Sequence, residues 1–213
     1  MSVMIDTVGT ATAKARYNRI APLYDRIQTM SERAFKPFRK KLWARAQGKV
    51  LEVGVETGLN IPFYPQGVWV TAMDLSDQML ARAQERAQEL GVRVDLREGD
   101  AQALAFPNHS FDTVAATFVF CSVPDPVVGL KELGRVVKPD GRILLLEHVR
   151  IDRPVIGPTM DLMNPLWVRL MGANINRRTV ENVKRAGLEI ESIEHLGPMQ
   201  MVKLIVAHPP RHA

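Results

Sequence analysis

Two glycines and one aspartate form the most informative chemical pattern in the sequence. The mostly apolar run 49–53 leads into Gly54, and Gly58 follows four residues later. A short apolar run that breaks into glycines predicts a buried strand followed by a turn. Asp74 lies twenty residues after Gly54, at the end of a second apolar run. Ligands of open α/β sheets bind beyond the carboxyl ends of the strands, where an acidic residue at this spacing can hydrogen-bond the ribose hydroxyls of a nucleoside.

Four stretches, in this order, resemble the motifs of the class I methyltransferases that depend on S-adenosylmethionine (SAM). Residues 51–58, Leu-Glu-Val-Gly-x-x-x-Gly, resemble motif I and differ from the G-x-G-x-x-G pattern of nicotinamide enzymes. Asp74 then stands at the end of the second apolar run. Residues 97–101 resemble the segment in which an aspartate and the next backbone N–H contact the adenine. Residues 137–143 resemble the "L-x-P-G-G" turn into the fifth strand.

This resemblance implies a fold, a cofactor and a set of cofactor-binding residues. The fold is an α/β, Rossmann-like class I methyltransferase fold, a seven-stranded, mostly parallel sheet with helices on both faces. Residues 188–195 and 201–207 are expected to form its antiparallel C-terminal hairpin. The cofactor is SAM, with S-adenosyl-L-homocysteine as the product, and no metal site is expected. The expected cofactor-binding residues are Tyr17, Glu52, Gly54, Glu56, Gly58, Asn60, Asp74, Leu75, Met79, Asp100, Ala101, Thr117 and Phe118.

Glu56 departs from the family pattern, which usually has a glycine at this position. A glycine suits a backbone that approaches the cofactor closely and adopts a positive φ. A side chain in the left-handed conformation costs about 1–2 kcal/mol, and the carboxylate of Glu56 would face the cofactor's own carboxylate. Two interpretations stay open: the residue weakens SAM binding, or it points sideways into solvent and has little effect.

The charge of the chain is concentrated near its N-terminus. The 213 residues carry a net charge of +5, are 46% hydrophobic and contain one cysteine, Cys121. These values predict a single globular domain without an internal disulfide, as suits a reducing compartment. Residues 14–49 hold eleven Lys and Arg against Asp25 and Glu32, a local charge of +9. A basic segment on a near-neutral body predicts a polyanionic partner, either nucleic acid or anionic lipid.

Residues 1–46 form a basic amphipathic arm ahead of the SAM-binding domain at 47–213. Apolar residues recur every three or four positions from residue 13 to 46, which predicts a helix interrupted near Pro22 and Pro37. An interfacial mixture of apolar and basic side chains at 35–43 favours contact with an anionic membrane. In the alternative, the apolar face covers the core of the domain. The longest apolar run, 114–123, is about half a membrane span, and we see no signal peptide, so we expect a cytoplasmic protein, peripheral on the inner face of the membrane.

Residues 17–25 resemble the "Y-D-x-x-A-x-x-Y-D" signature of methyltransferases of quinone biosynthesis and of bacterial phospholipid N-methyltransferases. Tyr17, Tyr24 and Asp25 match this signature, and Asn18 replaces its first aspartate. The resemblance implies that Tyr17 covers the bound cofactor, where an aromatic face can make a cation–π contact with a sulfonium. In the alternative, both tyrosines are packing residues.

The remaining segments predict the other elements of such a domain. Ser76 is expected to cap a helix that Gly91 ends, and Thr179 is a possible cap of the last helix. Further strands are expected at 92–97, 113–118 and 142–149, with a helix at 126–137. Residues 151–176 form an apolar insertion that prolines and glycines are expected to break into short pieces. It would form a wall for an apolar substrate or pack on the body.

The expected catalytic or substrate-handling residues are Tyr17, Tyr24, His148 and Arg150. The last two lie at 148–150, where the fifth strand is expected to end. An amine acceptor must lose its proton, and a phosphate beside it needs a cation. Cys121 has no base nearby in the sequence and is expected to line the pocket. Together with the resemblance, these residues favour methylation of phosphatidylethanolamine on nitrogen, with a phospholipid and an anionic membrane as partners. No "N/D-P-P-Y/F" tetrapeptide follows the fourth strand, which makes nucleic acid an unlikely partner, and no obligate protein partner is evident.

Three alternatives to this function stay open. The first is a C-methyltransferase of ubiquinone or menaquinone biosynthesis, and the second is a small-molecule methyltransferase. The third is a non-enzymatic binding protein, if Glu56 prevents SAM from binding.

Overall fold

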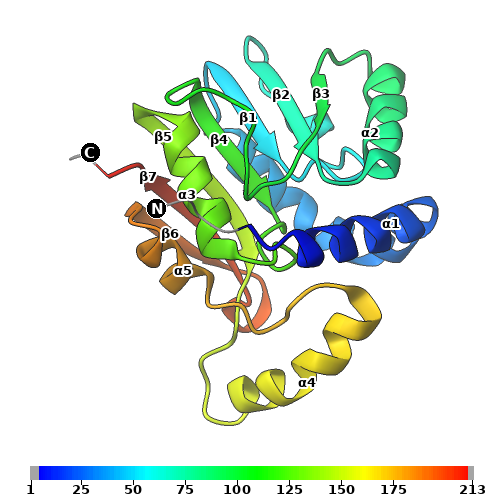
Figure 1. The fold of residues 1–213 in the computed structure, drawn as a ribbon, viewed down its shortest axis with the longest axis vertical. Coiled ribbons are helices and arrows are strands. Elements are labelled where there is room, and N and C mark those ends of the chain that lie inside the picture. The colour runs from blue at the N-terminus through cyan, green and yellow to red at the C-terminus, as the bar shows by residue number, and fades with distance from the viewer. Residues whose placement is uncertain (1–4, 211–213) are drawn as a thin grey trace.

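A seven-stranded sheet forms the centre of the protein (Figure 1). The computed structural model describes residues 5–210, apart from the side chains of residues 27–31 and 171. The strands are β1 (Lys49–Val53), β2 (Trp69–Asp74), β3 (Asp95–Glu98), β4 (Phe111–Thr117), β5 (Val137–His148), β6 (Glu189–Leu196) and β7 (Val202–His208). They lie in the order β3-β2-β1-β4-β5-β7-β6, with β1 to β5 parallel and β7 antiparallel to both β5 and β6. The predicted fold, including its C-terminal hairpin, is therefore confirmed.

Helices cover both faces of the sheet because each strand alternates its side chains between two apolar layers. On one face, Val50 of β1 packs with Leu42 and Trp43, near the end of α1 (Thr7–Trp43), and with α2 (Asp77–Leu90). On the other face, Leu51 belongs to a cluster with α3 (Pro126–Val136) and α5 (Thr179–Arg185). Two short 3₁₀ helices, η1 (Ile61–Phe63) and η2 (Pro198–Gln200), lie in connections. The sheet is thus buried on both sides, as parallel sheets require.

The N-terminal segment is one helix of 37 residues rather than the interrupted helix that we predicted. α1 begins earlier than expected, after Asp6, whose side chain accepts the backbone N–H of Gly9 at 2.8 Å. Pro22 and Pro37 both lie inside it. Each proline removes a single hydrogen bond of the helical ladder, and contacts with the body on both sides of Pro22 hold the two halves in line.

Three further expectations about local structure were wrong. The insertion is not broken into short pieces, because residues 156–171 form one helix, α4 (Ile156–Met171), which includes Pro165. The third strand is the short segment at 95–98 rather than 92–97. Thr179 is the first residue of α5 and not its cap, since Arg178 takes that place. By contrast, the Ser76 hydroxyl caps α2 by accepting the N–H of Met79 at 3.1 Å, as predicted, and Gly91 ends that helix in the left-handed conformation.

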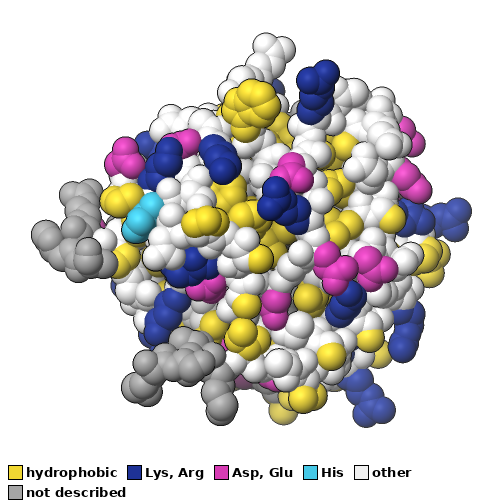
Figure 2. Space-filling model, turned by 45° about the horizontal axis from the view of Figure 1, so that its top comes forward, with side chains coloured by type: hydrophobic (Ala, Val, Ile, Leu, Met, Phe, Trp, Pro, Cys, Tyr) yellow, Lys and Arg dark blue, Asp and Glu magenta, His cyan; other side chains and the backbone are white. Residues whose placement is uncertain are grey.

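The apolar side chains of residues 35–43 pack on the protein body and do not form an exposed apolar surface. Leu42 and Trp43 are fully buried, and the Arg39 residue is only 3% exposed. Lys41 is paired with Glu194 of β6. The apolar face of this stretch therefore covers the core, whereas Lys36 and Lys40 stay exposed, and contact with a membrane stays a prediction. On the face shown in Figure 2, basic and acidic side chains are interspersed. Within residues 5–210, no helix has the length and apolar character needed to cross a membrane.

Candidate active site

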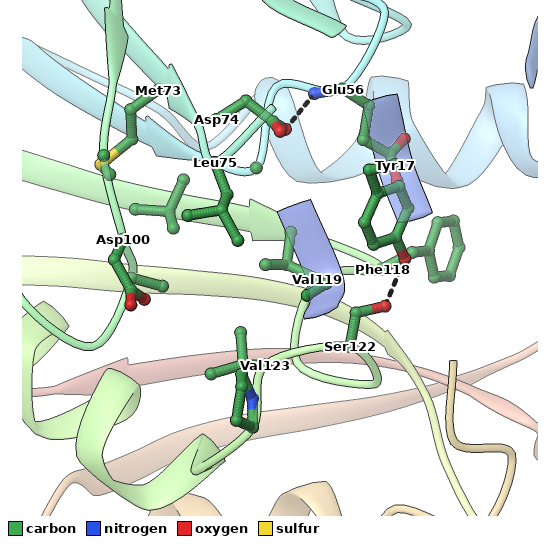
Figure 3. Close-up of a pocket in the computed structure, with 16 residues that line it drawn as sticks. Tyr17, Glu56, Met73, Asp74, Leu75, Asp100, Phe118, Val119, Ser122 and Val123 are labelled. Atoms are coloured by element: carbon green, nitrogen blue, oxygen red, sulfur yellow. Dashed lines mark hydrogen bonds between the residues drawn. The ribbon is translucent and has the colours of Figure 1, made fainter. Parts of the chain in front are cut away.

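A cavity of about 80 Å³ lies beside the neighbouring strands β1 and β4, at the carboxyl ends of the strands (Figure 3). The strand order reverses here, and such a switch point is where open α/β sheets bind ligands. Four strand ends and the first half of α1 supply its wall. We call it the first cavity; its lining residues are Ala13, Tyr17, Val53, Gly54, Glu56, Met73, Asp74, Leu75, Gly99, Asp100, Ala101, Phe118, Val119, Ser122, Val123 and Pro124.

Gly54 is required at the end of β1 for two reasons. Its φ is +73°, which disfavours any residue with a side chain. A Cβ at this position would also lie 2.3 Å from Cγ2 of Val119. The backbone N–H of Gly54 donates to the carbonyl of Met73 at 2.8 Å and ties the turn to β2. Gly58 has a similar conformation, with a φ of +81°, but lies outside the cavity wall, packed against Ile61.

Asp74 lies at the end of β2 and faces the turn that follows β1. One carboxylate oxygen accepts the N–H of Glu56 and the other accepts the N–H of Ser76, each at 2.9 Å. Burial raises the pKa of Asp74 to about 6, although these two hydrogen bonds oppose the shift. A carboxylate has about four acceptor sites, so Asp74 keeps the capacity to accept two ribose hydroxyls.

Asp100 lies at the end of the first cavity that is opposite Tyr17 and Glu56 (Figure 3), and it contacts the start of α1. Its carboxylate accepts the hydroxyl of Thr10 at 2.7 Å and the backbone N–H of Gln102 at 2.9 Å. The side chain of Gln102 donates to the same threonine hydroxyl at 3.0 Å. The first turns of α1 therefore close over the part of the cavity where the resemblance implies the adenine.

Tyr17 and Glu56 lie on the side of the first cavity that faces away from Asp100 (Figure 3). Tyr17, from α1, contacts Ser122 through its hydroxyl (Figure 3). Burial raises the pKa of this phenol well above its usual value, so it stays protonated. Glu56 has a φ of +53°, as its position predicted. Its carboxyl does not point into solvent, because it accepts the hydroxyl of Tyr24 at 2.5 Å and lines the cavity.

A second cavity, of about 470 Å³, adjoins the first. Of the described side chains, those of Tyr17, Glu56 and Phe118 line both. The other residues that line the second cavity come largely from α1, the segment after β5, and α4; they are Ile20, Tyr24, Phe35, Arg39, Cys121, His148, Val149, Met160, Trp167, Leu170, Ala173, Asn174, Ile175 and Met201. The space is mostly apolar, as expected for an acceptor that carries hydrocarbon.

His148 lies at the edge of the second cavity, between two aromatic rings. It stacks on Phe118 with ring centroids 4.4 Å apart and meets the edge of Phe35 at 5.2 Å. Burial, with the charge of Arg39 nearby, lowers the pKa of His148 to about 4. The imidazole is therefore neutral at physiological pH and is a weak proton acceptor.

Arg39, and not Arg150, is the cation of the second cavity. Arg150 pairs with Asp152 and Asp161 and is not part of the wall. Arg39 donates to Asn60 at 3.0 Å, pairs with Glu32 at 3.1 Å and lies 5.3 Å from the centre of the Phe118 ring. Sequence reasoning missed this role, although one signal was present: Arg39 follows Phe35 by four residues and precedes Leu42 by three, on the inner stripe of α1.

Several of the expected cofactor-binding residues lie behind the wall of the first cavity and not in it. Glu52 is fully buried and accepts the side-chain N–H of Asn60 at 2.5 Å and the hydroxyl of Tyr64. Burial raises the pKa of Glu52 to about 7. Since Asn60 also accepts from Arg39, motif I is joined to α1 by a continuous set of hydrogen bonds. Glu52, Asn60, Met79 and Thr117 do not line the first cavity, so their contact with the cofactor stays a prediction.

The second half of the tyrosine signature fixes α1 to motif I. Asp25 accepts the hydroxyl of Thr57 at 2.6 Å and pairs with Arg86 of α2 at 2.7 Å. Together with the hydrogen bond of Tyr24 to Glu56, these contacts hold α1 beside both cavities. The signature therefore positions the helix that separates the cavities from solvent.

Comparisons with known proteins agree with this geometry. The methyltransferase domain family matches residues 51–145. A phosphatidylethanolamine N-methyltransferase of Cereibacter sphaeroides is 44% identical over 108 residues, which are 50% of this chain and only 53% of that protein. A demethylmenaquinone methyltransferase of Lactobacillus johnsonii is 33% identical over 175 residues, 75% of this chain and 71% of that protein. A SAM-dependent methyltransferase from Aquifex aeolicus has the same fold, with a TM-score of 0.59, 20% identity, and coverage of 81% of this chain and 87% of that chain.

The chain belongs to the SAM-dependent methyltransferases, a class that its sheet, its glycine turn and its two acidic strand ends define. The first cavity fits SAM because Asp74 can accept ribose hydroxyls, Asp100 lies at its far end, and Gly54 leaves room beside Val119. When bound, SAM supplies the methyl group of its sulfonium. The electron pair of the C–S bond stays on sulfur when the methyl group is transferred. The residues of the chain hold the acceptor in line with that methyl and exclude water.

Proposed function

We propose that this protein methylates the amine of phosphatidylethanolamine, towards phosphatidylcholine, at a membrane surface. The combination of chemical groups that line the second cavity carries the proposal. These groups are the carboxyl of Glu56 and two tyrosines, the guanidinium of Arg39, and apolar side chains of α4. An ethanolamine phospholipid presents the matching groups, which are an ammonium, a phosphate and hydrocarbon.

Aromatic side chains suit the product of this reaction as well as its substrate. Each methyl transfer makes the amine more apolar while it keeps its positive charge, until a quaternary ammonium results. Aromatic faces attract such cations, and Tyr17, Tyr24, Phe35 and Phe118 all line the second cavity. The similarity to the Cereibacter sphaeroides enzyme supports the same acceptor.

We infer that the membrane meets α4 and the exposed side of α1, at the cytoplasmic face. Leu162, Leu166 and Leu170 of α4 are 80%, 53% and 68% exposed. Leu170 also lines the second cavity, so an acyl chain that leaves this cavity would pass the exposed apolar side of α4. Arg33, Lys36 and Lys40 of α1 are exposed and retain the positive charge that an anionic lipid surface attracts.

The second candidate is C-methylation of a quinone precursor. The similarity to the Lactobacillus johnsonii demethylmenaquinone methyltransferase favours it, because that match covers three quarters of this chain. The stacked Phe118 and His148 rings would also suit a planar acceptor. The presence of Arg39 argues for the phospholipid instead, since its guanidinium lines the second cavity beside Glu32 and a quinone ring has no phosphate to contact it.

Transfer of a radiolabelled methyl group from SAM decides between the two acceptors. Phosphatidylethanolamine and demethylmenaquinol are presented separately, in otherwise identical vesicles with and without anionic lipid. We expect label in mono-, di- and trimethylated phospholipid, and more of it when anionic lipid is present at low salt. Label in the quinol alone would refute the proposal in favour of the second candidate.

A further inference from the structure

We propose that Glu56 takes the proton of the acceptor ammonium and then serves as counterion of the methylated product. The inference rests on the proposed function, because it requires an amine acceptor. It concerns the position where this chain has a carboxyl in place of the glycine that usually occupies motif I.

The position of Glu56 between the two cavities is the first argument. Among the residues that the structure describes, three line both cavities, and Glu56 is the one of these three with a carboxyl group. The amine must lie at this junction, because its nitrogen has to meet the methyl of the cofactor in line. A proton acceptor has to be within hydrogen-bond reach of that nitrogen, and the Glu56 carboxyl is at the required place.

The geometry of Glu56 is the second argument. Its left-handed backbone, with a φ of +53°, is held by the hydrogen bond from its N–H to Asp74 at 2.9 Å. Strain of this kind is found preferentially at functional sites. The hydroxyl of Tyr24 occupies only one side of the carboxyl, by donating to Oε1 at 2.5 Å. A carboxylate accepts further hydrogen bonds, so it can also accept from an ammonium.

Three other ionisable groups of the second cavity are poorly suited to this step. Burial raises the pKa of Cys121 to about 12 and lowers that of His148 to about 4. Arg39 is cationic and would repel an ammonium. Glu56 differs from all of them, because burial raises its pKa to about 8. The charged and titratable groups around it are Arg39, Tyr24, Tyr17, Asp74, Glu52, Cys121 and Glu147.

The step balances without a further reactant. The Glu56 carboxylate takes one proton from the ammonium, which leaves a lone pair on nitrogen. This pair forms the new N–C bond while the electron pair of the C–S bond stays on sulfur. The product is again an ammonium. The proton on Glu56 passes to water, and the resulting carboxylate then pairs with this ammonium until the product leaves. A Glu56 carboxyl that is neutral in the empty site does not repel the carboxylate of the cofactor. The ammonium of the arriving acceptor then favours the ionised form of Glu56.

Glu56→Gln tests the inference, because it keeps the size and the hydrogen-bond acceptor but cannot take the proton. With phosphatidylethanolamine vesicles, the kcat/KM of the wild type should rise with pH and level off near pH 8, the pKa of Glu56. The variant depends on amine that is already deprotonated, whose pKa is about 10. It should therefore level off near pH 10 and be roughly 100-fold slower at pH 8, from the two-unit difference in pKa.

Two binding measurements separate a role towards the acceptor from a role towards the cofactor. Calorimetric titration with S-adenosylhomocysteine should give affinities within about threefold for the wild type and Glu56→Gln. Glu56→Gly relieves the backbone and should bind at least as tightly, but it should share the loss of activity. Short-chain phosphatidylcholine should bind to Glu56→Gln, loaded with S-adenosylhomocysteine, at least about fivefold more weakly. Glu181→Gln, at an exposed pair with Arg178 on α5, is the matched control.

Each result has one meaning. If the wild type methylates the phospholipid and Glu56→Gln has the same pH profile, the inference is wrong and the proposed function stands. A loss of S-adenosylhomocysteine affinity above tenfold in Glu56→Gln places the role at the cofactor and also overturns the inference. If the wild type methylates only the quinol, the proposed function fails, and the inference fails with it.

Discussion

Replacing Arg39 should reduce both the stability of the protein and its affinity for a phosphate-bearing acceptor. The side chain of Arg39 is 4% exposed and that of its partner Glu32 is 22% exposed. Removing one member of a buried ion pair costs about 3–5 kcal/mol. Because water still reaches Glu32, we expect Arg39→Met to cost about 2–3 kcal/mol, including the hydrogen bond lost by Asn60. For a chain of this length, this corresponds to a decrease in Tm of about 5–10 °C.

A double variant separates the two effects. Arg39→Met combined with Glu32→Leu removes the uncompensated carboxylate and should recover at least half of the lost stability, since apolar pairs replace buried ion pairs at little cost. It should not recover acceptor binding. A hydrogen bond to a charged group is worth about 1.5–3 kcal/mol, so the KM for phosphatidylethanolamine should rise roughly 10- to 100-fold in both variants. Arg93→Met, at an exposed position before β3, should change neither quantity.

Thermal unfolding and methyl-transfer kinetics measure these quantities on the same samples. An unchanged KM in the double variant would refute the assignment of Arg39 to the phosphate and leave it a purely structural residue. Equal stability of the single variant and the wild type would refute the energetic argument instead.

Three further substitutions test the site and its support. Gly54→Ala should abolish measurable S-adenosylhomocysteine binding by calorimetry while the protein stays folded, because the new Cβ would lie 2.3 Å from Val119; retained affinity would contradict the tight approach at this turn. Ser76→Ala removes the cap of α2 and should cost about 1–2 kcal/mol in urea unfolding, whereas Ser110→Ala, in an exposed turn, should cost less. Burial raises the pKa of Glu147 to about 8, so its stabilising contribution is full below about pH 4.5 and is lost as the pH rises through 8. The free energy of unfolding of Glu147→Gln, minus that of the wild type, should therefore be at least about 1 kcal/mol larger at pH 8 than at pH 5. A difference that does not change with pH would contradict this.

The sequence by itself determined the class of fold and the location of the cofactor site. Period-two and period-3.6 patterns depend on neighbours in the sequence, so strands such as 49–53 and the helix capped by Ser76 were predictable. The conformation of Glu56 was also predictable, because the glycine that usually occupies this position of motif I suits a positive φ. The first cavity then followed from the topology, since the carboxyl ends of parallel strands meet at one edge of the sheet.

Only the tertiary structure decided which charged groups are available for chemistry. Arg39 and Arg150 are equally basic in the sequence, and both are paired with carboxylates, but only Arg39 of the two lines the second cavity. The direction of the Glu56 carboxyl likewise depends on Tyr24, 32 residues away. The physical reason is the same in both cases. A local pattern fixes the face on which a side chain lies, but its partners come from distant segments, and those partners determine its charge, its burial and its role.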